Sequence, residues 1–354
     1  MAKGRTTLLF LACLFLSSST WALTKRSLAE DKSTPPSLIT ENGAENHFPA
    51  QILQMENFYT HHVLIVEKST HNLYLYENSN SYPKLVKTYQ IATGKKPGNK
   101  TNAGDFRTPE GVYYFTDFLS HNELLKRIGK EASIYGAGAF VMNYPNPFDH
   151  QEKKGGGGIW LHSTNDETRI DKGLDSRGCV VSANEDLKDI GQFLELDKTN
   201  IIIVQDVHFL RQETWKAARD GIQKTLDGWI DAWRIKDFNK YLSFYDPKDF
   251  RDPVRGNYPS FKRYKQAVFL NPGQPEINLY DVSMVQGDSY AVITFTQKYK
   301  SNTINDTGKK LLYMRKDDGY EWKIIAEIWA KLPAGAMNIA ERKPYFPTQR
   351  FFKN

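Results

Sequence analysis

Two short runs of this 354-residue chain decide the architecture of its first half: Gly158-Ile159-Trp160-Leu161-His162 and Ser176-Arg177-Gly178-Cys179-Val180. The first run predicts an apolar strand that stops at a histidine. The second predicts a polar turn that presents a cysteine seventeen residues after that histidine. A thiol nucleophile needs a base that takes its proton, and the base needs a group that orients it. The two runs therefore indicate a Cys179–His162 pair, with Gly178 letting the backbone approach a substrate closely.

Cysteine usage bears on whether this thiol works or is merely buried. The chain has two cysteines, Cys13 and Cys179. Cys13 lies in a segment typical of a signal peptide, with a basic start, an apolar run at 8–16 and small residues up to Ala22. Removal of residues 1–22 leaves an exported protein with one thiol, which forms no internal disulfide. A buried core cysteine is the alternative to a nucleophile. A lipoprotein cut before Cys13 is a weaker alternative to the signal peptide, because the preceding residues fit a lipobox poorly.

The composition is that of a globular protein and excludes several classes. Hydrophobic residues make up 40% of the chain and charged residues 25%, which argues against a disordered or fibrous protein. The length predicts two domains. The formal net charge of +6 suits a polyanionic surface, but no clustered basic module indicates a nucleic-acid partner. The chain has no H-E-x-x-H or C-x-x-C pattern, so we predict no metal and no cofactor.

Short apolar runs separated by turn signals predict a mainly β first domain over 50–211. The runs lie at 63–66, 73–76, 85–91, 112–115, 159–161 and 201–204. A capping box of Ser182 and Glu185 predicts a helix directly after Cys179, whose N-terminal field would lower the pKa of the thiol. The polar stretch at 23–49 contains paired prolines and predicts a flexible leader.

Apolar residues at helical spacing open a second domain over 212–335. They would form one face of a long helix: Trp215, Ile222, Leu226, Trp229, Ile230 and Trp233. A short helix near 241–245 and four strands follow, at 277–285, 290–299, 310–315 and 322–329. Helices followed by an antiparallel meander indicate an α+β domain with the helices on one face of the sheet. Residues 336–354 form a basic, aromatic tail.

The linked motifs resemble the signature of the L,D-transpeptidase (YkuD) catalytic domain. That signature is a histidine followed, after a gap, by Ser/Thr-x-Gly-Cys, and this chain has His162-Ser163-Thr164 before Ser176-Arg177-Gly178-Cys179-Val180. The runs Ile91-Ala92-Thr93-Gly94 and Thr108-Pro109-Glu110-Gly111 resemble further segments of the family. The resemblance spans about 60–206 and implies a mainly β YkuD-type catalytic domain.

The resemblance also implies a role for each residue of the two runs. Cys179 would attack the carbonyl at the L,D bond of a peptidoglycan stem peptide and form a thioester. His162 would act as base and then as acid. The backbone carbonyl of Ser163 would orient His162, and the N–H of Gly178, with its neighbours, would hold the oxyanion.

Two positions depart from the family's usual pattern. Many members have His where this chain has Arg177, and Arg where it has Val181. We predict that Arg177 binds a carboxylate of the substrate, since a guanidinium suits that task and cannot act as a base. Surface pairing with Asp175 or Asp171 is the alternative. Three further residues complete the predicted substrate-binding set, although the aromatic ones could instead belong to the core: Ser176, Trp160 and Tyr135.

The second domain resembles the NTF2-like fold, and the order of the two domains resembles the cell-shape-determining L,D-carboxypeptidases of helical bacteria. Those enzymes trim tetrapeptides to tripeptides with water as the acceptor. Other YkuD enzymes use an amine, and form 3–3 cross-links or attach protein to the wall. The resemblance implies an exported, periplasmic, wall-associated enzyme whose partners are peptidoglycan stem peptides. It leaves open a glycan or small ligand in the NTF2-like pocket, a homodimer, and a non-catalytic wall-binding protein.

Overall fold

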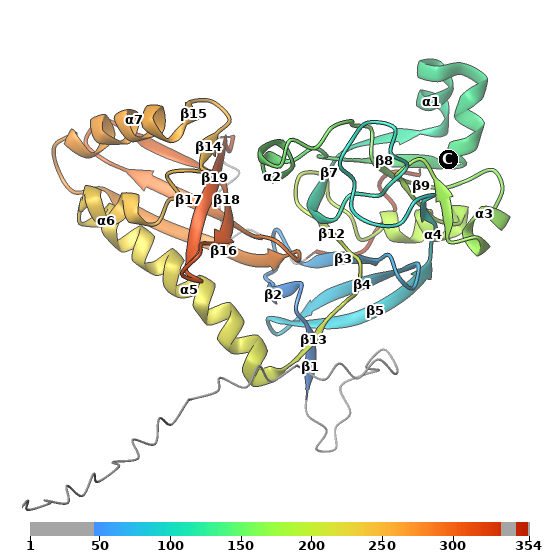
Figure 1. Cartoon of the computed structure of the whole chain (residues 1–354), viewed down its shortest axis with the longest axis horizontal. Coiled ribbons are helices and arrows are strands. Elements are labelled where there is room, and N and C mark those ends of the chain that lie inside the picture. The colour runs from blue at the N-terminus through green and yellow to red at the C-terminus, as the bar shows by residue number, and fades with distance from the viewer. Residues whose placement is uncertain (1–45, 334–344, 353–354) are drawn as a thin grey trace, which may run out of the picture. The chain divides into compact units, whose positions relative to one another are not determined.

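An eight-stranded sheet forms the first domain of the computed structural model, which describes residues 46–333 and 345–352 (Figure 1). Its strands are β3 (His62–Glu67), β4 (Asn72–Ser79), β5 (Tyr82–Gln90), β7 (Gly111–Ser120), β8 (Gly138–Met142), β9 (Trp160–His162), β11 (Val180–Val181) and β12 (Asn200–Val204). They lie in the order β11-β9-β8-β7-β12-β3-β4-β5. The mainly β first domain is thus confirmed. The signal peptide predicted at 1–22 lies outside the described residues.

Strand β12 lies in the interior of this sheet, between β7 and β3. It pairs in parallel with β3 and antiparallel with β7, so that Ile202 lies opposite both Ile65 and Val112. All five residues of β12 are buried, as expected for a strand that is covered on both faces. Helix α4 (Asn184–Gly191) and its neighbours share one apolar cluster with β12, and apolar residues of the second domain share the other.

Short elements between these strands carry the segments that later build the site. They are β6 (Thr93–Gly94), α1 (His121–Ile128), the 3-10 helix η1 (Gly129–Tyr135), α2 (Pro147–Gln151), α3 (Thr168–Asp171) and β10 (Leu174–Ser176). Strand β10 pairs in parallel with β6. This pairing ties the residues just before Cys179 to a segment more than eighty residues earlier in the chain.

Three helices pack against a second sheet, which confirms the α+β second domain. The helices are α5 (Gln212–Arg234), α6 (Phe238–Ser243) and α7 (Tyr258–Leu270). The sheet runs β15-β14-β19-β18-β17-β16-β2, with bounds β2 (Ile52–Gln54), β14 (Arg251–Asp252), β15 (Gly256–Asn257), β16 (Glu276–Gln286), β17 (Ala291–Lys300), β18 (Asn305–Lys316) and β19 (Trp322–Lys331). All six apolar residues predicted to face the core from α5 are buried. Helix α7 was not predicted, because its buried face is formed by Phe261, Lys265 and Phe269, and the lysine interrupts the apolar pattern.

Two domain boundaries in the structure differ from those predicted from the sequence. The leader expected at 23–49 ends before His47, because strand β1 (His47–Pro49) pairs with β13 (Phe209–Arg211). Strand β2, expected in the first domain, instead pairs with β16 of the second. Trp215 of α5 donates its indole N–H to the Ile52 carbonyl at 2.7 Å, which fixes this crossing of the chain.

The predicted capping box at the start of α4 is wrong. The helix begins at Asn184, its N-cap is Ala183, and no side chain of the cap accepts a hydrogen bond. The hydroxyl of Ser182 is buried without a partner. Glu167, from a different segment, accepts the Asn184 backbone N–H at 2.9 Å instead. A tertiary contact thus replaces the local cap.

The described part of the tail, 345–352, packs on the first domain. The ring of Tyr345 stacks on that of His61 with centroids 3.9 Å apart. Phe351 and Phe352 pack against Phe118 at 5.1 Å and 4.8 Å. Tyr345, Phe351 and Phe352 are therefore occupied by intramolecular packing, whereas Phe346 is exposed. Within the described residues, no helix combines the length and apolar character that crossing a membrane requires.

Candidate active site

Strand pairing brings the cysteine segment beside the histidine segment. Strands β11 and β9 are parallel neighbours, with Val180 opposite Leu161 and Val181 opposite His162. Cys179 therefore directly precedes a strand that pairs with the strand ending at His162. The backbone N–H of Ser182 also donates to the His162 carbonyl at 2.9 Å. The two predicted runs thus lie next to each other at one edge of the sheet.

His162 is buried and held in one orientation. Its Nδ1 lies 2.6 Å from the Ser163 carbonyl oxygen, the contact that the family resemblance implies. A proton on Nδ1 makes this hydrogen bond and leaves Nε2 as the basic nitrogen. Burial lowers the pKa of His162 to about 4, against the opposing effect of the Ser163 hydrogen bond. The imidazole is therefore neutral at pH 7 and able to accept a proton.

Cys179 is half-buried, and its thiol is kept protonated by its surroundings. Burial raises the pKa of the Cys179 thiol to about 11, although a hydrogen bond from the Trp160 backbone and the charges of Lys100 and Arg169 act in the opposite direction. Its Sγ lies 3.5 Å from the Gly158 carbonyl oxygen. The expected lowering of the thiol pKa by the following helix is wrong. Helix α4 starts only at Asn184, beyond the reach of its terminal field.

The turn before the cysteine is closed by its own hydrogen bonds. The Ser176 hydroxyl donates to the Cys179 carbonyl at 2.6 Å and accepts the Gly178 N–H at 3.0 Å. Ser176 is buried, so it shapes the turn and is not exposed to a substrate, contrary to the prediction. The Gly178 N–H, predicted to hold the oxyanion, is engaged within the turn. A Cβ at Gly178 would lie 2.8 Å from the Arg107 carbonyl oxygen, at a φ of +129°, so the position requires glycine.

Of the two aromatic residues predicted to line the site, Tyr135 packs against the imidazole of His162 and Trp160 packs against Tyr135. The ring centroid of Tyr135 is 4.8 Å from that of His162 and 5.0 Å from that of Trp160. Both aromatic side chains are half-buried. The pKa of Tyr135 is raised by burial, with further effects from Cys179 and Arg177. This clustering places Tyr135, Trp160, His162 and Cys179 in one site.

Arg177 is exposed, and a different arginine occupies its expected partner. Arg169 donates from Nε to Asp175 Oδ2 at 2.5 Å, and Lys172 lies 3.9 Å from Asp175 Oδ1. Arg169 therefore holds the carboxylate that the alternative, a surface pair of Arg177 with Asp175, would need. Sequence reasoning missed Arg169, because nothing in the local pattern of α3 shows that this residue folds back toward the Cys179 turn.

The second domain holds a buried charged cluster that sequence reasoning also missed. Glu327 lies 2.6 Å from Lys310 Nζ and 3.3 Å from Lys265 Nζ, and it accepts the Tyr245 hydroxyl at 2.7 Å. All three charged side chains are less than a tenth exposed. Burial lowers the pKa of Lys310 to about 8, while the two lysines hold the pKa of Glu327 well below its usual range. We call these three residues the Lys-Glu-Lys cluster.

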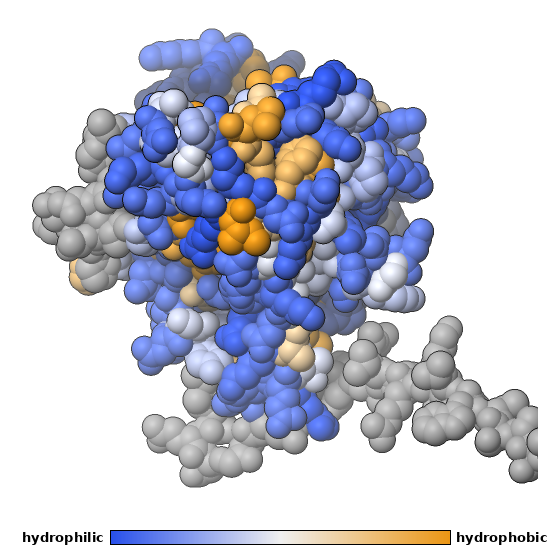
Figure 2. Space-filling view, turned by 90° about the vertical axis from the view of Figure 1, so that its left-hand side faces the viewer, coloured by the Kyte–Doolittle hydropathy of each residue, from blue (hydrophilic) through white to orange (hydrophobic). Residues whose placement is uncertain are grey.

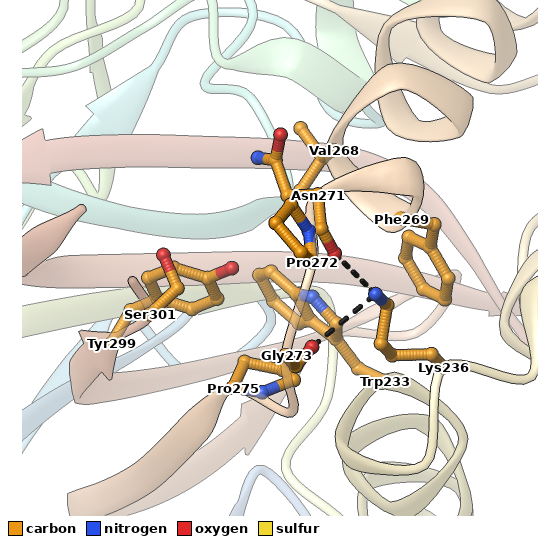
Figure 3. Close-up of a pocket in the computed structure, with 10 residues that line it drawn as sticks. All are labelled: Trp233, Lys236, Val268, Phe269, Asn271, Pro272, Gly273, Pro275, Tyr299 and Ser301. Carbon is orange, nitrogen blue, oxygen red and sulfur yellow. Dashed lines mark hydrogen bonds between the residues drawn. The ribbon is translucent and has the colours of Figure 1, made fainter. Parts of the chain in front are cut away.

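Two cavities are lined by residues of the second domain, and they differ in size. One lies between the ends of α5 and α7 and holds about 10 Å³, enough for one water molecule (Figure 3). Lys236 spans it and donates to the carbonyls of Asn271 and Gly273. A larger cavity of about 480 Å³ has a polar lining that includes Gln51 and Asp288. Among the described residues, no group of His, Cys, Asp and Glu side chains is placed to hold a metal ion.

The surface of the second domain is mainly hydrophilic on the side seen in Figure 2, with apolar side chains in small groups. Its exposed apolar residues include Ile235, just after α5, and Leu270, at the end of α7. Apolar residues scattered in this way are normal on a monomer and carry no argument for a partner surface.

Comparisons with known proteins agree with this geometry. The L,D-transpeptidase catalytic domain (YkuD) matches residues 61–203, and the Cds6 C-terminal NTF2-like domain matches residues 221–328. The structure of Bd1075 from Bdellovibrio bacteriovorus is 30% identical, with a TM-score of 0.70, over 82% of this chain and 100% of that one. The helical cell shape determining protein Pgp2 from Campylobacter jejuni is 25% identical, with a TM-score of 0.60, over 79% of this chain and 95% of that one. No curated protein matched the chain. The chain belongs to the L,D-transpeptidase (YkuD) family, with a catalytic domain followed by an NTF2-like domain.

Proposed function

We propose that this protein is an exported, periplasmic L,D-carboxypeptidase that trims peptidoglycan stem tetrapeptides to tripeptides through a thioester on Cys179. One observation carries the proposal: β9 and β11 pair so that the turn carrying Cys179 leads into a strand beside the one that ends at a buried His162, whose Nδ1 contacts the Ser163 carbonyl. A nucleophile, a base and a group that orients the base are the parts of cysteine acyl transfer. Affiliation with the family supplies the substrate class.

The first half of the reaction forms the thioester. Cys179 attacks the carbonyl carbon of the L,D bond while Nε2 of His162 takes the thiol proton. Because both groups are neutral before attack, the proton moves as the carbon–sulfur bond forms. The tetrahedral oxyanion then collapses, and the departing D-amino acid nitrogen takes the proton from His162. Backbone N–H groups of the Cys179 turn would stabilise the oxyanion, with Gly178 contributing once its N–H leaves Ser176.

The second half regenerates the enzyme. Nε2 of His162 takes a proton from water as the water oxygen attacks the thioester carbon. The carbon–sulfur bond breaks, the thiol is restored, and a shortened peptide with a free carboxylate leaves. An amine acceptor would follow the same steps and give a 3–3 cross-link or an attached protein, which is the second candidate function. The resemblance in domain order and the likeness to Pgp2, whose name links it to helical cell shape, favour hydrolysis and a role in shape.

The substrate contacts are part of this proposal. Tyr135 packs against His162 and Trp160 packs against Tyr135, and both aromatic side chains would pack against the stem peptide. Arg177 is exposed next to the turn and would bind a substrate carboxylate in place of the arginine missing at Val181. The NTF2-like domain would position the enzyme on the wall, with the ligand that the sequence left open. A homodimer stays a prediction.

Mass spectrometry of purified muropeptides tests the proposal. The wild-type protein should convert tetrapeptides to tripeptides without new dimers, and Cys179→Ala should convert none. New 3–3 dimers would instead identify a transpeptidase. Unchanged muropeptides with the wild-type protein, across several amine acceptors, together with retained binding to isolated walls, would favour the non-catalytic wall-binding protein.

A further inference from the structure

Arg169 occupies a central place between the two halves of the candidate active site. It lies in α3, after His162 and before Cys179 in the chain. Its side chain is 19% exposed and that of its partner Asp175 is 15% exposed, so the pair is shielded from water. A half-buried ion pair of this kind is screened less than a surface pair and holds its geometry better.

The guanidinium joins three segments that each carry a residue of the site. Nε donates to Asp175 Oδ2 at 2.5 Å, on the strand that leads into the Cys179 turn. Nη1 donates to Thr164 Oγ1 at 3.2 Å, two residues after His162. Nη1 also donates to the Ile134 carbonyl at 3.4 Å, next to Tyr135. A planar fork with several donors can hold these three acceptors at once, whereas an ammonium group cannot match that geometry.

Neighbouring hydrogen bonds also tie the histidine segment to the Tyr135 turn, because the Ser163 hydroxyl donates to the Tyr135 carbonyl at 3.1 Å. The Thr164 hydroxyl is otherwise used within its own loop, on the Asp166 backbone. The Asn184 side chain donates to the Thr164 carbonyl and accepts the Ala137 N–H. The Ser163 hydroxyl also accepts the Ala137 N–H. Within the described residues, the side-chain hydrogen bonds that connect the His162 segment with the strand before Cys179 come from Arg169.

The positive charge of Arg169 has the sign that the proposed reaction of Cys179 and His162 needs. It opposes protonation of His162 and favours the thiolate of Cys179. Two other cations of this region are Lys100 and Arg177. Lys100 is tied to Asp105 at 2.7 Å, and Arg177 is exposed to solvent. Lys100 also favours the thiolate, and Arg169 is the cation that acts on both Cys179 and His162.

We propose that Arg169 is the positioning residue of the Cys179–His162 site, tying the histidine segment, the Tyr135 turn and the cysteine turn together while holding a fixed positive charge beside the thiol. This inference rests on the proposed function, in which Cys179 is the nucleophile. Arg169 touches neither substrate nor the reacting atoms, and it acts through the two residues that do.

The test measures the reactivity of the thiol without any peptidoglycan. Iodoacetamide is added between pH 6 and 10, and alkylation of Cys179 is followed by peptide mass spectrometry. Arg169→Gln should slow alkylation by about three- to tenfold below the thiol pKa, because loss of a nearby charge shifts a pKa by up to about one unit. Arg169→Lys keeps the charge and should stay within about twofold of the wild type.

A matched control lies on the same carboxylate. Lys172 is also close to Asp175, but its side chain is 59% exposed, so Lys172→Gln should leave alkylation unchanged. Turnover of muropeptides gives the second readout. Arg169→Lys should lower turnover by about tenfold or more, because the ammonium group loses the fork that aligns the three segments.

Alkylation of Arg169→Gln at the wild-type rate would overturn the proposal, as would an Arg169→Lys variant with wild-type turnover. A thermal unfolding curve for each variant shows that it is folded. If Arg169→Gln does not fold, Arg169→Lys decides through its turnover. If Cys179→Ala retains turnover, the proposed function fails, while the alkylation rates still decide whether Arg169 governs the thiol.

Discussion

The candidate active site and the Lys-Glu-Lys cluster of the second domain both bury groups that can ionise, and they do so in opposite ways. In the active site, burial keeps His162 and Cys179 neutral, with a lowered pKa for the imidazole and a raised pKa for the thiol. In the cluster, Glu327 is charged and lies within 3.3 Å of two lysine ammonium groups. One region avoids buried charge, and the other offsets it.

The difference shows what each region is suited to. A neutral pair costs little to bury and creates charge only when the reaction begins, where oriented dipoles can stabilise it. A buried ion cluster of this kind depends on its carboxylate, because loss of Glu327 leaves two ammonium groups uncompensated in an apolar core. Substitutions in the active site should therefore affect rate, and substitutions in the cluster should affect folding.

The largest expected effect is on rate, from removal of the base. His162→Gln should lower muropeptide turnover by about 10²–10⁴-fold, the usual contribution of a positioned general base. Its thermal midpoint should move little, because glutamine can still donate toward the Ser163 carbonyl. A folded variant with more than a tenth of wild-type turnover would show that His162 is not the base.

The next effect is on stability. Glu327→Gln leaves Lys265 and Lys310 buried without a counter-ion and should lower the free energy of unfolding by about 3–5 kcal/mol. Chemical denaturation followed by circular dichroism measures it. Lys310→Met is the control, because Glu327 keeps Lys265 as a partner and the cluster then has no excess charge. Equal losses for the two variants would contradict the description of the cluster as charge-offsetting.

A smaller effect combines rate and stability at the turn. Gly178→Ala places a Cβ 2.8 Å from the Arg107 carbonyl at a φ that favours glycine. We expect a loss of about 1–3 kcal/mol in unfolding free energy and a larger fractional loss of turnover, because the turn presents Cys179. Gly157→Ala is the matched control, since a Cβ there meets no atom within 4 Å. Wild-type turnover in Gly178→Ala would show that the turn tolerates displacement.

The smallest effect is the shape of the pH profile, which tests the neutrality of the pair. His162 must be unprotonated to act as base, so kcat/KM should fall only as the pH drops toward about 4, the pKa of His162. Above that it should stay level through neutrality, because the thiol pKa is about 11. Activity measured from pH 3.5 to 9 checks this. An acid limb near pH 6.5 would indicate a solvent-like imidazole and remove the contrast with the cluster.

Some of the site could be predicted because its residues are close in the chain or marked by turn residues. The run that ends at His162 could be predicted as a strand, and the glycine segment at Cys179 as a tight turn. In the structure, this strand, β9, pairs with β11, which follows the turn. Other predictions failed where a distant residue took over a local task. Glu167 replaces the predicted cap of α4, and Ser176 turns inward to close the turn.

The amino-acid sequence alone determined the two fold classes, most of the strands and the long helix that build them, and the family, and it predicted the Cys179–His162 pair. These follow from apolar periodicity and from motifs whose spacing is local. Only the tertiary structure decided the role of Arg169, the pairing of β2 with the second domain, and the Lys-Glu-Lys cluster. These depend on contacts between residues far apart in the chain and on burial, which together with nearby charges and hydrogen bonds sets whether a thiol, an imidazole or an ammonium group carries charge.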